Sequence, residues 1–160
     1  SFKWFINLFG IHLFPTLIVN LCLFPLYFYF IENSTSVGSL DYLICLFTFS
    51  MVLLEQISDE QMHTFKRNIT NKDKTMNQGL WQYSRHPNYL GEVGFWFGLC
   101  GFGLIGSNGS LILLICPIAM LLMFMFASIP MMDNRSLENR PDYAEYMKKT
   151  SSLMILPIKK

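Results

Sequence analysis

Four apolar segments most constrain what this chain can fold into. They run over roughly Trp4 to Ile31, Tyr42 to Leu54, Tyr89 to Ile105 and Leu111 to Met131. A helix rises about 1.5 Å per residue and a hydrocarbon core is about 30 Å thick, so such segments are of the length that crosses a membrane. The second segment is short unless Glu55 and the next turn form its polar end. The pattern predicts an all-α, polytopic membrane helix bundle with about four transmembrane helices.

Composition supports this interpretation. Of the 160 residues, 52% are hydrophobic and only 14% are charged, so water is not the main solvent of this chain. The formal net charge of +1 lacks the basic excess of a nucleic-acid-binding domain, and we expect no nucleic acid partner. We expect a single membrane domain over residues 1–160, with room for further helices upstream because residue 1 is Ser rather than Met.

Basic residues predict the orientation of the segments. None of the 12 lysines and arginines lies between the first two segments or between the last two. By the positive-inside rule, both termini and the central loop face the cytoplasm, or the matrix if the membrane is mitochondrial. The composition fits an integral protein of either the endoplasmic reticulum or the mitochondrial inner membrane.

Two polar stretches hold nearly all the ionisable side chains: the central loop, Glu55 to Asn88, and the tail, Asp133 to Lys160. Both leave the membrane on the same predicted side, so we expect them to form one polar cap over the inner mouth of the bundle. The candidate cofactor segments of this cap are residues 55–92 and 133–157. No pair of histidines has metal-ligand spacing with a third donor, so no metal site is predicted.

A motif in the central loop suggests an anion site. Pro87 suits the first turn of a helix, which places Arg85 and His86 beside free amide groups and the positive end of the helix dipole. Such a helix terminus suits a phosphate. The aromatic side chains of the same stretch could flank a flat ring; they are Trp81, Tyr83 and Tyr89. The alternative is that the cations reach lipid headgroups and the aromatic residues form an interfacial belt.

Glu92 is an ionisable residue inside an apolar segment, where charges are costly and usually functional. Helical spacing places it on one face with Arg85 and Asn88, directed into the bundle. The structural alternative is a buried carboxylate paired with Lys66 or Arg67. Glu55 is either a further cofactor contact or the polar end of the second segment.

The stretch GLWQYSRHPNYLGE, residues 79–92, followed by Trp96 and Gly98, resembles the signature of the DUF1295 membrane proteins. These are relatives of the steroid 5-alpha-reductase carboxy-terminal domain, in a superfamily with sterol reductases and isoprenylcysteine carboxyl methyltransferases. The resemblance extends upstream and downstream to the family's lead-in and carboxy-terminal motifs. The matching residues are Glu55, Asp59, Gln61, Phe65 and Lys66 upstream, and Pro141 to Thr150 with Tyr143 and Tyr146 downstream.

The resemblance implies roles for individual residues. In the reductases, the residues that match Asn88 and Glu92 contact the nicotinamide end of NADPH. By the same resemblance, Asp59 and Lys66 would lie near the phosphates and ribose of the cofactor. Arg67 is one of five cations of the central loop that would hold the other charges of a dinucleotide. Tyr143 and Tyr146, with Arg135 and Arg140, either close the cap over the adenine end or belong to a tail helix that shields the loop. No catalytic proton donor is identified.

Three functions therefore stay open. The favoured one is a membrane-embedded, NADPH-dependent reductase of a lipid or steroid-like enone double bond. The first alternative is a noncatalytic membrane subunit that keeps the fold within a larger assembly, with other membrane subunits as partners. The second is a lipid methyltransferase that uses S-adenosylmethionine, because the methyltransferases share the pattern Arg-His-Pro-x-Tyr that Arg85 to Tyr89 satisfies.

Overall fold

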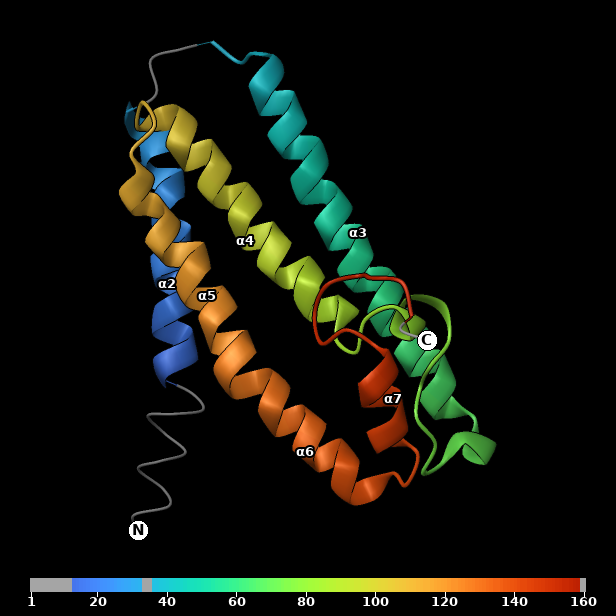
Figure 1. Ribbon diagram of the computed structural model, residues 1–160. Coiled ribbons are helices and arrows are strands. Elements are labelled where there is room, and N and C mark those ends of the chain that lie inside the picture. The colour runs from blue at the N-terminus through green and yellow to red at the C-terminus, as the bar shows by residue number, and fades with distance from the viewer. Residues whose placement is uncertain (1–12, 33–35, 159–160) are drawn as a thin grey trace. The chain divides into compact units, whose positions relative to one another are not determined.

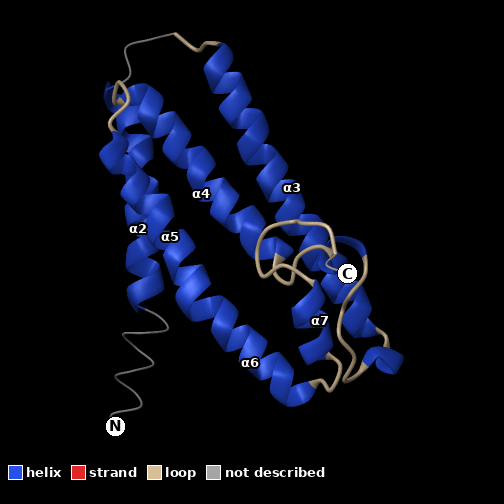
Figure 2. Ribbon diagram, viewed as in Figure 1, coloured by secondary structure: helices blue, strands red, loops and turns tan. Residues whose placement is uncertain are grey.

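The computed structural model describes residues 13–32 and 36–158, and every regular element in these ranges is helical (Figures 1 and 2). The α-helices are α2 (Phe14–Tyr27), α3 (Ser39–Arg67), α4 (Pro87–Gly106), α5 (Ile115–Met123), α6 (Ile129–Asn139) and α7 (Tyr143–Lys149). π-helical turns extend α2 over Phe28–Glu32 and join α5 to α6 over Phe124–Ser128. Short 3-10 turns cover Ile69–Asn71, Gly79–Gln82 and Leu111–Leu114. The predicted all-α class is confirmed.

Within the described residues, four helical stretches are long and apolar enough to cross a membrane: Phe14–Ile31, Ser39–Arg67, Pro87–Gly106 and Leu111–Asn139. The prediction of a polytopic bundle with about four transmembrane helices is confirmed on length and composition. The first segment was predicted from Trp4, and its part before residue 13 lies outside the described residues.

Two of the predicted boundaries are wrong. The second segment does not end near Leu54, because α3 has 29 residues and continues to Arg67, so it includes residues 55–67, more than a third of the stretch predicted as a loop. Residues 55–67 contain neither Gly nor Pro, and their polar side chains are compatible with a helix. The fourth stretch likewise continues as α6 to Asn139, two residues before Pro141.

Packing divides the described chain into two compact units. The first unit holds the described residues up to Thr48 together with Phe95–Leu121. Its helices approach closely at glycines of α4: a Cβ on Gly98 would collide with the side chain of Thr48, and one on Gly103 would collide with Pro25. Such small residues let helix backbones pack tightly in a membrane, where apolar burial alone does not drive association.

The second unit holds Phe49–Gly94 and the described residues from Leu122 onward. Here Gly91 of α4 lies against α3, where an added Cβ would stand 2.7 Å from the Met51 carbonyl oxygen. Helix α7 is followed by an extended segment, Thr150–Ile158, which we call the C-terminal strap. Both predicted cap stretches, the central loop and the tail, belong to this unit. The ionisable residues predicted for the site therefore all lie within it.

Candidate functional site

The segment just before α4, residues 81–86, is held in place by bonds from three directions. The Trp81 indole Nε1 donates to the carbonyl oxygen of Ser58 on α3 at 2.9 Å. The Ser84 hydroxyl donates to the Leu153 carbonyl oxygen in the strap at 2.7 Å, and the Tyr146 hydroxyl of α7 donates to the Trp81 carbonyl oxygen. These contacts order the segment from which Arg85 and His86 project.

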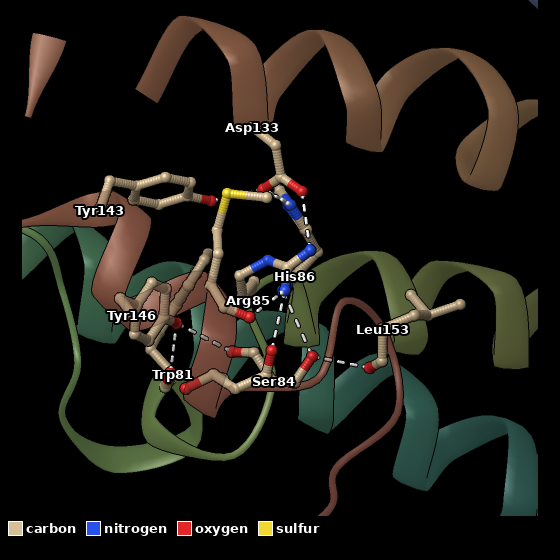
Figure 3. A network of polar contacts seen from close by, with 10 residues as sticks. Trp81, Ser84, Arg85, His86, Asp133, Tyr143, Tyr146 and Leu153 are labelled. Carbon is tan, nitrogen blue, oxygen red and sulfur yellow. Dashed lines mark hydrogen bonds and ion pairs between the residues drawn. The ribbon is translucent and has the colours of Figure 1, made fainter. Parts of the chain in front are cut away.

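Asp133 is the centre of the polar network in this unit (Figure 3). Its carboxylate pairs with Arg85 Nη2 at 2.9 Å and with His86 Nε2 at 3.0 Å, and it accepts a hydrogen bond from the Tyr143 hydroxyl at 2.5 Å. Asp133 is only 5% exposed. A buried carboxylate is costly unless charged and hydrogen-bonding partners surround it, and these three side chains supply them.

The guanidinium of Arg85 is hydrogen-bonded mainly to other groups of the protein. Its Nη1 donates to the carbonyl oxygens of Met147 and Thr150 at 3.2 and 2.8 Å, at the C-terminal end of α7, where the helix dipole favours a cation. The prediction that Arg85 shares a helix face with Asn88 and Glu92 is wrong, because α4 begins only at Pro87. Arg85 precedes the helix, and its guanidinium is bonded to α6 and α7.

Two tyrosines of α7 stay protonated donors over the physiological range. Burial raises the pKa of Tyr143, and its hydrogen bond to the Asp133 carboxylate raises it further. Burial also raises the pKa of Tyr146. Their hydroxyl groups therefore act as fixed hydrogen-bond donors to Asp133 and to the Trp81 carbonyl.

An inner cavity of about 180 Å³ lies beside this network. Nine of the fourteen residues predicted for the site line it: Asp59, Lys66, Trp81, Arg85, His86, Asn88, Tyr89, Tyr143 and Tyr146. The His86 ring is stacked on Tyr89 at 5.1 Å, and Tyr89 contacts Phe124 at 4.6 Å between ring centres. Residues from α3, α4, α6 and α7 thus meet around one space, as the resemblance implied.

Two basic clefts adjoin the inner cavity, with volumes of about 390 and 370 Å³. Lys66 and Arg140 line all three spaces, so the spaces adjoin one another, and we call them together the depression. The two clefts present six cationic side chains and the single acidic residue Asp73. The cations are Lys66, Arg67, Lys72, Lys74, Arg135 and Arg140.

The other three predicted residues line none of these spaces. Tyr83 is 38% exposed, so it does not flank a ring in the cavity. Glu55 packs beside Gly91, and its carboxylate interacts electrostatically with Glu92 and Asp59. Glu92 is half-buried on α4, and of the Asn88–Glu92 pair predicted for the nicotinamide end only Asn88 lines the inner cavity.

Sequence reasoning gave Asp133 no role in the site, although it is the network's centre. The available signal was an acidic residue just beyond an apolar segment, the same kind of signal that drew attention to Glu55. Ser84 and the strap carbonyls of Ser151 and Leu153 were also missed. Ser84 takes part through its hydroxyl, and Ser151 and Leu153 take part through backbone carbonyl oxygens, which no side-chain motif reveals.

Two unpartnered atoms remain near the cavity. Among the described residues, Arg85 Nε and the side-chain oxygen Asn88 Oδ1 are buried without a hydrogen-bond partner. Because buried polar atoms are nearly always hydrogen-bonded, such atoms point to a missing partner. Asn88 Oδ1 is an acceptor, so that partner would be a donor.

Comparison with known proteins agrees with the motif. The family model described as "Protein of unknown function (DUF1295)" matches residues 2–150. An uncharacterized protein of Schizosaccharomyces pombe is 30% identical over an alignment of 131 residues, which covers 68% of this chain and 38% of the relative. The chain therefore spans well under half the length of that relative. No solved structure matches the chain. Because the family match covers nearly the whole sequence, including the network around Arg85, His86 and Asp133, the chain belongs to the DUF1295 family.

Proposed function

We propose that the inner cavity and its two basic clefts bind NADPH, and that the protein is a membrane-embedded reductase of a lipid or steroid-like enone double bond. One observation carries this proposal. Apart from Glu55, Tyr83 and Glu92, the residues predicted to contact the cofactor, which are spread from Asp59 to Tyr146 along the chain, line this depression.

The charge of the depression favours NADPH over S-adenosylmethionine. NADPH carries a pyrophosphate and an additional phosphate, whose oxygens suit clustered Arg and Lys side chains. S-adenosylmethionine has a single carboxylate and a cationic sulfonium group. The two clefts, with six cationic side chains and one acidic side chain, would repel the sulfonium group. The ligand that this surface fits best is therefore a polyanion.

The volumes of the three spaces suggest which part of NADPH each space would hold. Ligand pockets typically measure about 300–1,000 Å³, so the inner cavity of about 180 Å³ is too small for a whole dinucleotide. It suits the nicotinamide end, and the two outer clefts suit the phosphates and the adenosine. The unpartnered acceptor Asn88 Oδ1 fits the donor group of a carboxamide, which a nicotinamide ring carries.

When bound, NADPH would supply a hydride to the carbon of the double bond that lies far from the carbonyl. The residues of this chain would position it. Lys66 and Arg140 would bind phosphate where the cavity meets the clefts, and Asn88 and Tyr89 would orient the ring. Asp133, through Arg85 and His86, would hold the wall of the cavity in place.

The noncatalytic membrane subunit is the second candidate. The observation that favours it is that Arg85, His86 and Tyr143 are already paired with Asp133 and satisfy that cluster without a ligand. This candidate predicts either no NADPH binding or binding without NADPH consumption.

The test is a thermal-shift titration of the detergent-purified protein with NADPH and, separately, with S-adenosylmethionine. A ligand that binds only the folded state stabilises it by about 2.7 kcal/mol at a hundredfold excess over its Kd. We expect stabilisation by NADPH, which the double variant Lys66→Ala, Arg140→Ala loses and the Asn88→Leu variant weakens. Lys148→Ala is the matched control, because Lys148 is an exposed cation that lines none of the three spaces.

Other outcomes would replace the proposal. A response to S-adenosylmethionine alone would favour a methyltransferase, and no response to either ligand would favour the structural subunit. Binding of NADPH without its consumption in the presence of lipid and steroid enones would keep the cofactor site and contradict the reductase.

A further inference from the structure

The C-terminal strap is bonded through its backbone to the segment that leads into α4. The Arg85 N–H donates to the Ser151 carbonyl oxygen at 2.8 Å, and Ser84 and Ser151 form a parallel bridge. Further along, the Leu156 N–H donates to the Tyr83 carbonyl oxygen at 3.3 Å. The strap therefore lies beside residues 83–85 over most of its length.

The length of α4 places this segment at the membrane surface. The helix has 20 residues, which at about 1.5 Å per residue extend about 30 Å, the thickness of a hydrocarbon core. All of α4 is needed to cross, so its first residue, Pro87, lies at the edge of the hydrocarbon. Residues 83–85 and the strap bonded to them then lie in the interfacial layer.

At this level the strap presents apolar side chains outward. Leu153 is buried, whereas the next three residues, Met154, Ile155 and Leu156, are 55%, 39% and 48% exposed. The exposed ring of Tyr83 belongs to the residue that bonds Leu156. Three consecutive exposed apolar residues beside an exposed tyrosine are unfavourable in water, but tyrosine is enriched at membrane interfaces.

We infer that the strap is an interfacial membrane anchor, in which Met154, Ile155 and Leu156 insert into the headgroup layer of the bilayer around α4. The occupant of this surface is lipid, because the strap is hydrogen-bonded to residues 83–85 at the level where α4 begins, and its exposed side chains there are apolar. Tyr83 is then part of the same lipid contact rather than of the cofactor site. The inference does not depend on NADPH binding.

The anchor also acts on the polar network. The carbonyl groups of Thr150, Ser151 and Leu153 bind Arg85 and Ser84, so a strap held by lipid keeps those residues in place. Insertion of the three side chains into the bilayer therefore helps to keep the segment around Arg85 ordered.

The experiment attaches an environment-sensitive fluorophore to Leu156→Cys in a Cys45→Ala, Cys116→Ala background, with the protein reconstituted in lipid vesicles. Cys45 is removed because its side chain is exposed and Cys116 because it is partly exposed, whereas Cys22 and Cys100 are buried. The quenchers are lipids with a nitroxide near the glycerol, lipids with a nitroxide near the chain end, and aqueous iodide. The same label on Lys148→Cys, an exposed residue of α7, is the matched control.

We expect the label at 156 to be quenched at least about twofold more by the shallow nitroxide than by the deep one, as for an interfacial segment. The label at 156 should also be protected from iodide. The label at 148 should be quenched by iodide and protected from the lipid nitroxides. Quenching of the label at 156 by iodide as strong as at 148 would overturn the inference. Protection from both iodide and lipid nitroxides would also overturn it, because the strap would then be covered by protein. Met154→Cys repeats the test if Leu156→Cys does not fold.

Discussion

The two units of the chain are stabilised in different ways. In the first, helices approach closely at small side chains: glycines of α4 meet Thr48 and Pro25, and the Cys22 thiol donates to the Cys116 carbonyl oxygen at 3.2 Å. In the second, the contacts are charged and join residues far apart in sequence, as between Arg85 and Asp133. The comparison teaches that the first unit supplies membrane-spanning structure and that the ionisable chemistry is gathered in the second.

The largest expected effect is in the second unit. Asp133→Asn removes the charge that pairs with Arg85 and His86, and leaving a buried charge without its partner costs about 3–5 kcal/mol. We expect a lower thermal midpoint and faster proteolysis within the cap stretches. Glu138→Gln, an exposed acid on the same helix, should leave both unchanged. Equal stability of Asp133→Asn and the wild type would show that the network does not hold this unit.

A second change tests whether the first unit depends on close helix contact. Gly98→Leu forces a side chain into Thr48, and overpacking of this kind costs about 1–3 kcal/mol. Gly38→Ala is the control, since its new Cβ would lie 3.8 Å from the nearest atom, the Asp41 carboxylate oxygen. Thermal unfolding in detergent measures both. A Gly98→Leu variant as stable as Gly38→Ala would contradict tight packing of α4 against α3 at this level.

A third change tests how the central loop is joined to α3. Trp81→Phe keeps an aromatic ring but removes the indole N–H that donates to the Ser58 carbonyl oxygen. Loss of one such hydrogen bond costs about 0.5–1.5 kcal/mol, so the thermal midpoint should fall. NADPH stabilisation should also weaken, because Trp81 lines the inner cavity. A Trp81→Phe protein with unchanged stability would mean that this hydrogen bond contributes little.

The smallest expected effect depends on pH. Burial opposes ionisation of Asp142, but the side chain and backbone N–H of Thr75 both donate to its carboxylate, and together they lower its pKa below the ordinary value of about 4. A group whose pKa is lower in the folded state stabilises the fold above its unfolded pKa, and this contribution is lost as pH falls through the folded value. The thermal midpoint of the wild type should therefore fall more steeply below about pH 4 than that of Asp142→Asn. Parallel pH profiles would refute the assignment.

The helical class and the membrane segments were predictable, because hydropathy and helix length are local properties of the sequence. The helix boundaries were less predictable from the sequence. The helix α3 continues into a polar stretch because neither Gly nor Pro interrupts it, whereas hydropathy alone placed its end near Leu54. Most of the candidate site followed from the motif around Arg85 and His86, since nine predicted residues line one cavity.

By itself, the sequence determined that this chain forms apolar helices joined by basic, aromatic stretches, because these properties depend on the order of nearby residues. Only the tertiary structure decided which charges meet. Arg85 and Asp133 are 48 positions apart, and their pairing depends on how α6 packs beside the start of α4. Tyr83, two residues before Arg85, is exposed and does not line the cavity, and its backbone is bonded by the strap. Side-chain partners across such separations are set by packing, which local patterns do not encode.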